Sequence, residues 1–180
     1  MYILSIDVGM LNLGLVYIKW DGESIDVEVA RKIDLTRCIH RVVPPNECTL
    51  YHTNAICDRV AHFFQEWEFY FVQADIILME RQPPMGLKDI EALIQFNWRS
   101  KVHMISPQSM HKHFRMSGDY DMRKIETTAM ATPYLLGHKL PERKHDIADA
   151  VCMFLFWKAT RPLPPRKQGE VRPFDEFKLY

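Results

Sequence analysis

Short apolar runs bounded by turn residues indicate where strands form along this chain. The runs are rich in Ile, Leu and Val, and most of them end at Gly, Asn, Pro or a charged residue, which is typical of strands. The predicted strands are residues 2–8, 13–20, 25–35, 74–80 and 102–105. The third run alternates imperfectly between apolar and polar residues, so we expect it to be more exposed than the others.

Apolar residues spaced three or four positions apart predict helices between and after these strands. The predicted helices are residues 49–71, 87–100, a short one that starts at Ser106-Pro107, 122–134 and 145–157. Ser at the N-cap followed by Pro at the first helical position is a common helix start, which supports the short helix. Phe96 has core spacing in its helix, and residues 36–48 and 117–119 are predicted to be loops.

The order of these elements predicts the fold class. Three strands come first, and helices then alternate with the remaining strands, which favours an α/β fold with a mixed five-stranded sheet flanked by helices. The chain is long enough for one domain and shows no internal repeat. We expect residues 1–160 to form this domain and residues 161–180 to form a Pro-rich basic C-terminal tail that contains Arg166, Lys167 and Arg172.

Charge is unevenly distributed, although the net charge is zero. Residues 1–80 hold 6 Lys and Arg against 12 Asp and Glu, whereas residues 81–180 hold 17 against 11. This asymmetry is consistent with a nucleic-acid-binding face in the second part, and equally with chance. The hydrophobic content of 47% and charged content of 26% are ordinary for a soluble protein.

Cysteine usage and the N-terminus indicate a soluble intracellular protein. The cysteines are Cys38, Cys48, Cys57 and Cys152. Their spacing matches neither a zinc site nor a disulfide framework, which favours a reducing compartment. The N-terminus lacks the basic start of a secretory signal, and Asp7 interrupts its apolar run. No run approaches the roughly 20 apolar residues that cross a bilayer.

Four carboxylates stand out because of their positions relative to the apolar runs. Asp7 ends the first predicted strand, and Glu80 ends the fourth. Asp146 and Asp149 lie at the start of the last predicted helix with a spacing that puts both on one helix face. A carboxylate is costly to place against apolar surroundings unless its charge is compensated. Four that converge predict a divalent metal site, and hence a hydrolase that acts on phosphodiesters.

Each of these carboxylates also has an ordinary structural explanation. Asp7 suits a turn or a helix cap, and Glu80 suits a rim position paired with the next residue, Arg81. The aspartates of the last helix suit the positive end of the helix dipole, although Asp149 lies one turn further in, among apolar residues. His145 is an additional ligand, an outer partner of a ligand, or a residue that caps the helix.

As a set, the four residues match the ligand preference of Mg²⁺, a hard cation that binds carboxylate and water oxygens. Two such ions about 4 Å apart activate an attacking water and stabilise the leaving oxygen of a phosphodiester. Four carboxylates in one place repel one another, so bound cations would relieve that repulsion.

Three sequence blocks built around these carboxylates resemble a known family. The blocks are Ser5-Ile6-Asp7-Val8-Gly9 with Asn12-Leu13-Gly14, then Met79-Glu80-Arg81-Gln82, then Asp146-Ile147-Ala148-Asp149-Ala150. In this order they resemble the RuvC-type Holliday junction resolvases, which have the RNase H-like fold. The resolvases of poxviruses, of related large DNA viruses and of fungal mitochondria look most similar, and the resemblance spans about residues 2–157.

The resemblance implies an Mg²⁺-dependent endonuclease, with Mn²⁺ as a substitute, that cuts two opposed strands of a four-way DNA junction as a homodimer. The catalytic metal ligands that it implies, for two ions per site, are Asp7, Glu80, Asp146 and Asp149. It also implies a basic residue after the fifth strand that stabilises charge at the scissile phosphate. Lys124 is the candidate, with Arg123 or Lys112 as alternates, and a solvated helix lysine is the plain alternative.

One position departs from the family pattern. Relatives often carry Lys just before the Asn of the opening turn, where this chain has Leu11, so a phosphate contact from this turn is not expected. If the protein is viral, it would act in the host-cell cytoplasm or at the site of viral DNA replication. If it is of the fungal type, it would act in the mitochondrion.

Junction DNA is expected to be bound mainly through its phosphates. The basic candidates are Arg81, Lys88, Arg99, Lys101, Lys112, Arg115, Arg123, Lys124, Arg143 and Lys144. Tyr120 is expected in a polar loop and is the candidate to wedge into an opened junction. Either helix 49–71 or helix 87–100 could form the dimer interface.

Other functions stay open on sequence alone. A different RNase H-like nuclease would act on RNA–DNA hybrids, transposon ends, or branched and flap DNA. A non-catalytic DNA-binding relative would be expected to lack one of the acidic residues, yet all four are present. A sugar-kinase or actin-like ATPase opens with a similar strand, but 180 residues leave no room for its second lobe.

Overall fold

Five strands form one mixed sheet in the computed structural model, which describes residues 1–37 and 53–161. The strands are β1 (Tyr2–Asp7), β2 (Leu13–Trp20), β3 (Ile25–Ile33), β4 (Ile76–Glu80) and β5 (Val102–Ile105). Their order across the sheet is β3-β2-β1-β4-β5. The first three pair antiparallel, whereas β4 is parallel to β1 and β5 is parallel to β4. The predicted mixed five-stranded sheet is therefore confirmed, with β1 at its centre.

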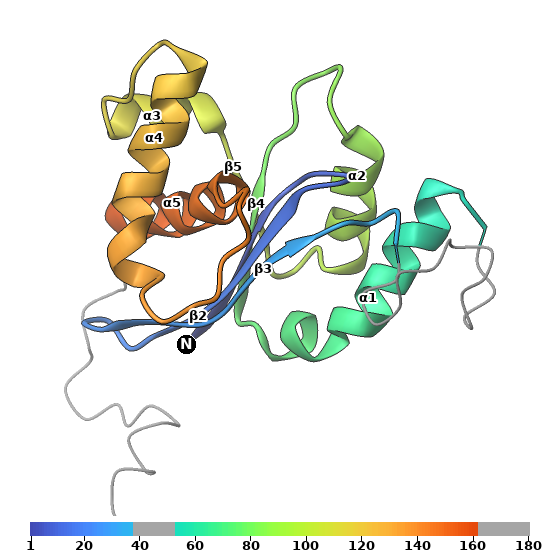
Figure 1. Ribbon diagram of the computed structural model, residues 1–180. Coiled ribbons are helices and arrows are strands. Elements are labelled where there is room, and N and C mark those ends of the chain that lie inside the picture. The colour runs from blue at the N-terminus through green and yellow to red at the C-terminus, as the bar shows by residue number, and fades with distance from the viewer. Residues whose placement is uncertain (38–52, 162–180) are drawn as a thin grey trace, which may run out of the picture.

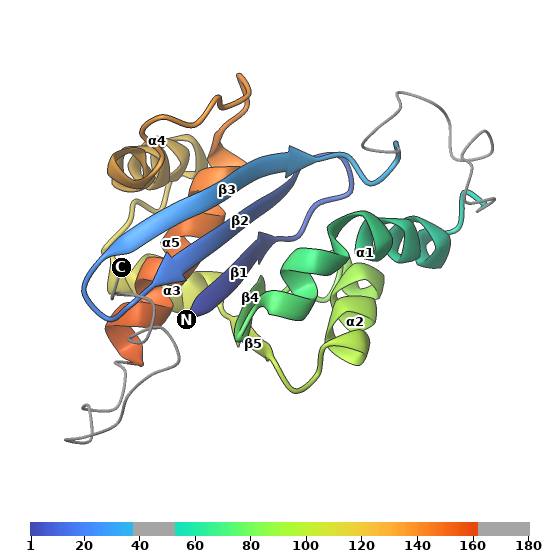
Figure 2. The same ribbon diagram turned by 90° about the horizontal axis from the view of Figure 1, so that it is seen from below.

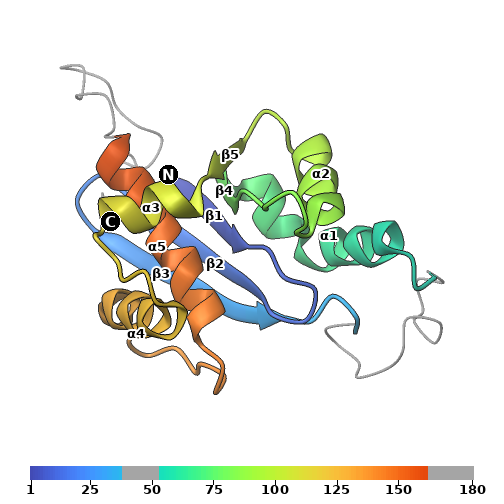
Figure 3. The same ribbon diagram turned by 90° about the horizontal axis from the view of Figure 1, so that it is seen from above.

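Helices cover both faces of this sheet (Figure 1). They are α1 (Ile56–Gln73), α2 (Lys88–Asn97), α3 (Pro107–His113), α4 (Tyr120–Ala131), a short 3-10 helix η2 (Thr132–Tyr134) and α5 (His145–Thr160). Helices α1 and α2 lie together on one face, as the view from below shows (Figure 2). Helices α3, α4 and α5 lie on the other face, and α5 crosses the sheet over β1 and β2 (Figure 3).

Side-chain alternation along the central strand determines which layer each residue faces. Leu4 and Ile6 pack in the apolar cluster under α1 and α2, whereas Ile3 packs in the cluster under α5. Ser5 also points toward α5, because its hydroxyl donates a 2.7 Å hydrogen bond to the backbone carbonyl of Ala150. Since side chains on one face of a strand are two residues apart, Asp7 follows Ile3 and Ser5 onto the α5 face.

The same alternation places the acidic end of β4 on this face. Leu78 packs in the cluster under α5, and Met79 packs in the opposite cluster. Glu80 therefore faces α5, as Asp7 does. The parallel register pairs Ile6 with Met79, so the next residues along the two strands, Asp7 and Glu80, lie side by side at the edge of the sheet.

Gly14 allows α5 to approach the sheet closely beside Asp7. It is paired with Asp7 across β1 and β2, and a Cβ added to it would lie 2.1 Å from the backbone oxygen of Asp146. Only a residue without a side chain leaves room for the first turn of α5 at this point. The glycine in the second strand therefore helps to bring Asp146 to the end of the first.

We expect Gly14→Ala to destabilise the protein and to displace the start of α5. The clash is with backbone atoms of a packed helix, and overpacking of this kind costs about 1–3 kcal/mol, or roughly 2–12 °C in Tm for a chain of this size. Thermal unfolding followed by circular dichroism measures the loss. Gly118→Ala is the control, because nothing lies within 4 Å of a Cβ added there. Equal melting temperatures for the two variants would contradict the packing argument.

The predicted bounds of most described elements agree with the structure to within three residues. The first helix differs more, because it begins at Ile56 and residues 53–55 of the predicted helix precede it; residues 49–52 of that prediction lie outside the described residues. The backbone N–H of Thr53 donates a 2.8 Å hydrogen bond to the Asp58 carboxylate, so Thr53 lies in a turn that precedes the helix and is not part of it. Helix α4 starts earlier than predicted, because Asp119 caps it by accepting a 2.9 Å hydrogen bond from the N–H of Met122.

The assignment of Phe96 to the core was wrong, because its side chain is 83% exposed. The buried face of α2 is formed by Ile90 and Ile94, and Phe96, two residues further on, points away from it. Cys152 is buried and Cys57 is exposed. The other two cysteines, the loop at 38–48 and the tail from residue 162 lie outside the described residues. Within the described ranges, no helix combines the length and hydropathy that a membrane span needs.

Candidate active site

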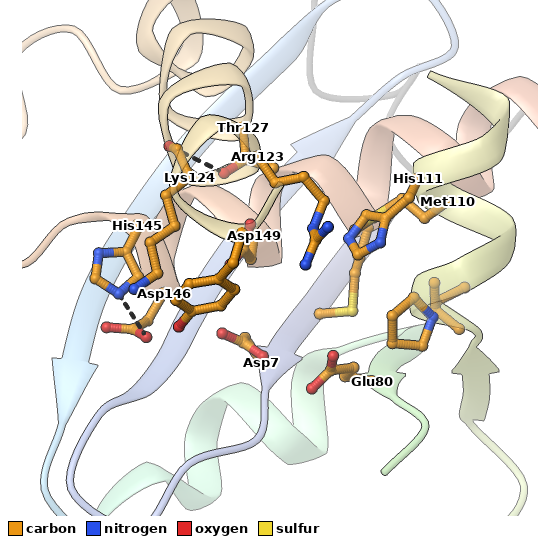
Figure 4. Close-up of a pocket in the computed structure, with 14 residues that line it drawn as sticks. Asp7, Glu80, Met110, His111, Arg123, Lys124, Thr127, His145, Asp146 and Asp149 are labelled. Carbon is orange, nitrogen blue, oxygen red and sulfur yellow. Dashed lines mark hydrogen bonds and ion pairs between the residues drawn. The ribbon is translucent and has the colours of Figure 1, made fainter. Parts of the chain in front are cut away.

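A cavity of about 220 Å³ lies where the ends of β1 and β4 meet helices α3, α4 and α5. All four carboxylates singled out in the sequence line it: Asp7, Glu80, Asp146 and Asp149. Figure 4 shows Asp7 in the middle of this group, with Glu80 on one side and the two aspartates of α5 on the other. Residues that are far apart in the chain are thus brought together by β1, β4 and the first turns of α5.

Asp7 and Glu80 form a pair of adjacent carboxyl groups. A hydrogen bond links their side chains, and Gln82 donates a second hydrogen bond of 2.8 Å to Glu80 Oε2. Burial raises the pKa of Asp7 well above its usual value, and the negative charges of Glu80 and Asp149 raise it further. Burial also raises the pKa of Glu80. In the absence of a cation, a proton shared between the two carboxyl groups relieves their repulsion.

Asp149 is the second carboxylate with a strongly perturbed pKa. Burial raises the pKa of Asp149 to about 7, the charges of Glu80 and Asp146 add to this effect, and a hydrogen bond with Thr127 opposes it. The capping or dipole explanation does not account for this position, because Asp149 lies in the second turn of α5 and faces the other carboxylates. Asp149 is therefore only partly ionised near neutral pH when no cation is bound.

Asp146 differs from the other three because its charge is compensated by a neighbouring cationic group, Arg143. Its side chain accepts hydrogen bonds from Arg143, at 2.9 Å from Nε to Oδ2 and 3.3 Å from Nη2 to Oδ1. His145 Nε2 lies 3.4 Å from Oδ1. The hydrogen bond with Asp146 raises the pKa of Arg143. Asp146 is thus a buried carboxylate held in a close ion pair, and His145 is its neighbour within the site.

The carboxylates fit a divalent cation by their chemistry. Among residues 1–37 and 53–161, no three His, Cys, Asp or Glu side chains are gathered tightly enough to form a metal-ligand cluster. The four nevertheless present oxygen donors to one cavity, and the pKa values of Asp7, Glu80 and Asp149 are raised by burial and, in part, by neighbouring charges. A hard cation bound by such oxygens would remove this unfavourable charge interaction.

The raised pKa of Asp149 predicts how stability depends on pH without added metal. In the folded protein the pKa of this carboxyl group is about 7, whereas in the unfolded chain the group releases its proton near its ordinary pKa of 3.8. Between these values the folded state binds more protons, so its contribution to stability falls as pH rises. We therefore expect Asp149→Asn to melt about 5 °C or more above the unsubstituted protein at pH 8, and close to it at pH 4.5.

Thermal unfolding in chelator at the two pH values tests this expectation. Asp121→Asn, which removes an exposed carboxylate from α4, is the matched control and should follow the unsubstituted protein at both. An Asp149→Asn variant that melts below the unsubstituted protein at pH 8 would contradict the unfavourable burial of this charge.

The three basic candidates for phosphate stabilisation are not equivalent. Lys124 and Arg123 line the cavity, whereas Lys112 is exposed on α3 and does not. The guanidinium group of Arg123 donates hydrogen bonds to the backbone carbonyls of Ser117 and Gly118 at 3.2 and 2.6 Å. Lys124 Nζ lies 3.9 Å from the centre of the Tyr120 ring in a cation–π contact. Lys124 is thus held by an aromatic ring and Arg123 by backbone carbonyls, and both side chains extend from α4 toward the carboxylates (Figure 4).

The two other predicted DNA contacts occupy different places. Tyr120 lines the cavity and is 58% exposed, but it is the first residue of α4 and not part of a loop. Arg81 lies outside the cavity, in a separate groove along β5 and the end of α5 that also contains His103 and Arg161. The rim pair considered for Arg81 and Glu80 is replaced by the hydrogen bonds of Glu80 with Asp7 and Gln82.

Sequence reasoning missed several residues of the site. His111 lines the cavity, and burial together with the charge of Arg123 lowers its pKa. Thr127 is buried against Asp149, and Ser5 anchors α5 to β1. A polar residue at a buried helical position signals Thr127, and a serine inside an aliphatic strand signals Ser5. His111 has no comparable signal, because it lies on a short helix with weak periodicity.

The chain was compared with known proteins by sequence and by structure. A family model described as "Poxvirus A22 protein" matches residues 1–160. No curated protein sequence matches the chain.

Among solved structures, the fowlpox virus Holliday junction resolvase superposes with a TM-score of 0.62 at 16% identity, covering 89% of this chain and 99% of that one. The complex of fowlpox virus resolvase with its substrate Holliday junction DNA gives 0.60 at 18% identity, covering 89% and 98%. Thermus thermophilus RuvC gives 0.53 at 16% identity, covering 90% and 98%. These likenesses confirm the expected fold, the RNase H-like fold of RuvC.

Proposed function

Because this chain belongs to the poxvirus A22 protein family, we propose that it is a Holliday junction resolvase, a nuclease that makes paired symmetrical cuts in four-way DNA junctions. One observation carries the proposal: four carboxylates from three separate sequence blocks line a single cavity at the end of the central strands. The fold shared with the fowlpox virus enzyme, which was solved with junction DNA, supports the choice of substrate.

The ligands that we propose for divalent cations are Asp7, Glu80, Asp146 and Asp149. When bound, such ions supply an activated water and neutralise charge on the phosphodiester. The protein's own part is to hold these carboxylates together against their repulsion. Gly14 and Ser5 do so by fixing α5 against β1, and Thr127 and Gln82 do so by hydrogen bonds to Asp149 and Glu80. We propose Mg²⁺ as the physiological ion, with Mn²⁺ as a substitute.

Lys124 is proposed to approach the scissile phosphate and stabilise the negative charge that develops on it. Its Nζ reaches the cavity from α4, and the Tyr120 ring holds it there without neutralising it. A positive charge that is already in position before the reaction stabilises developing negative charge more strongly in a site that excludes water than in bulk water. Arg123 would bind phosphate at the cavity wall, and the exposed ring of Tyr120 would contact unstacked bases at the branch point.

The protein is proposed to act as a homodimer, since two symmetrical cuts need two active sites related by a two-fold axis. The α1 and α2 layer supports this by leaving large apolar side chains exposed, namely Phe69 and Val72 on α1 and Phe96 on α2. Sedimentation at micromolar concentration tests this proposal, because detection of the 21.3 kDa monomer alone would contradict a stable dimer.

Family membership favours the site of viral DNA replication over the mitochondrion as the place where the protein acts. Imaging of the tagged protein can test this location.

A substrate panel separates this function from its nearest alternative. A second RNase H-like activity, on RNA–DNA hybrids or on flaps, would use the same carboxylates. We expect a synthetic four-way junction to be cut at least about tenfold faster than a hybrid or flap duplex of the same sequence, a difference of about 1.4 kcal/mol. Faster cleavage of the hybrid would overturn the resolvase assignment and leave the nuclease assignment in place.

A further inference from the structure

The ion pair between Arg143 and Asp146 occupies both oxygens of a proposed metal ligand. Arg143 Nε donates to Oδ2 and Nη2 donates to Oδ1, while His145 Nε2 also approaches Oδ1. Asp146 is 7% exposed, so little water reaches these oxygens. Each carboxylate oxygen keeps a lone pair for a cation, but a cation bound there would lie close to the guanidinium group, and two positive charges at that distance repel each other.

We propose that Arg143 competes with the metal ions for Asp146 and thereby raises the metal concentration at which the active site fills. The proposal rests on the proposed function, because it takes Asp146 as a metal ligand. In this account Arg143 is a positioning residue that acts through Asp146 and does not touch the reacting atoms. When a cation fills the site, it replaces Arg143 as the partner of Asp146.

The two partners differ in their freedom to move, and this determines which one yields. Asp146 belongs to the first turn of α5, and its backbone carbonyl packs directly against Gly14 of β2. Arg143 precedes the helix, outside regular secondary structure, and its side chain is 46% exposed. The guanidinium group can therefore move into solvent with little loss of free energy, whereas the carboxylate is held in place by the packing of α5 on the sheet.

The alternative role for Arg143 is to orient Asp146 for the metal, as outer partners often orient metal ligands. An orienting partner of a metal ligand is usually a neutral or negatively charged group. Arg143 instead contacts both oxygens, at 2.9 and 3.3 Å, and places a full positive charge beside the position that a cation would take. The geometry therefore favours competition, and the two roles predict opposite effects on metal affinity.

Thermal unfolding titrated with MgCl₂, without DNA, measures this affinity separately from catalysis. We expect Arg143→Gln to lower the half-saturating Mg²⁺ concentration about tenfold. This is the fold-change expected when a competitor that binds Asp146 through a charge-assisted hydrogen bond is removed. The metal-free Tm of the variant should fall at the same time, because Asp146 loses its partner. Arg143→Lys keeps the charge and loses the two-point contact, so its half-saturating concentration should lie between the two.

Lys144→Gln is the matched control, because it removes the same charge from the adjacent, exposed residue. It should change the half-saturating concentration by less than about twofold, since an exposed charge is largely screened. An unchanged or higher half-saturating concentration in Arg143→Gln, confirmed by direct Mn²⁺ binding in electron paramagnetic resonance, would overturn the competition. Absence of any metal-dependent stabilisation in the unsubstituted protein would overturn the metal site itself, and the competition with it.

Discussion

Asp7→Asn is expected to slow junction cleavage by at least about 10³-fold, or about 4 kcal/mol, while junction binding persists. Asp7 ends the central strand and lies beside Glu80 and the aspartates of α5, so in the proposed ligand set its carboxylate would contact the bound cations. An amide keeps the size of the side chain but loses the negative charge that metal ions need. Cleavage of a labelled synthetic junction under single-turnover conditions measures the rate.

The control for this prediction is Asp26→Asn, which removes an exposed carboxylate from β3 of the same sheet and should cut like the unsubstituted protein. The substitution in the site should also raise the metal-free Tm, because it removes a buried carboxyl group whose pKa is raised by burial and by like charges. A variant that melts higher and binds DNA but does not cut would separate loss of catalysis from loss of folding. Cutting at the normal rate would contradict the proposed ligand set.

Lys124→Gln should reduce the cleavage rate by about 10²–10³-fold, the range seen when one preorganised stabilising group is removed from a reaction centre. The lysine lines the carboxylate cavity and is held against the Tyr120 ring, so its charge would be available to a phosphate bound there. The loss should appear in the rate at saturating DNA, since the contact strengthens as charge develops during the reaction.

Lys112→Gln is the matched control for Lys124, because Lys112 is exposed on α3 and does not line the cavity. We expect it to weaken junction binding slightly at low salt and to leave the rate at saturating DNA unchanged. Lys124→Arg should restore part of the rate, which a purely structural lysine would not require. A normal rate in Lys124→Gln together with a loss in Lys112→Gln would exchange the roles of the two residues.

The sheet could be predicted from the sequence because strand signals are local. Runs of Ile, Leu and Val with turn residues at their ends locate β1, β2, β4 and β5 to within two residues. The starts of α1 and α4 were predicted less well, since Asp58 and Asp119 accept hydrogen bonds near these starts that periodicity does not reveal. The exposure of Phe96 had no local signal either, because helical spacing gives the faces of α2 but not which face packs.

The carboxylates of the site could be predicted because each one interrupts an apolar pattern. Asp7 and Glu80 end buried strands, and the spacing of the two aspartates on α5 fixes their common face. Their partners depend on contacts between distant parts of the chain. The pairing of Arg143 with Asp146, the entry of His111 into the cavity and the exclusion of Arg81 from it all follow from how the helices pack on the sheet.

We propose above all that the carboxylate cavity cuts opposed strands of branched DNA with the help of a divalent cation. The most direct test incubates a synthetic four-way junction with the protein and Mg²⁺, with each of its strands labelled in turn. We expect nicks at symmetrical positions in two opposed strands, none in the linear duplex of the same sequence, and none when the cation is chelated. Equal cutting of junction and duplex, or cutting that persists in chelator, would contradict it.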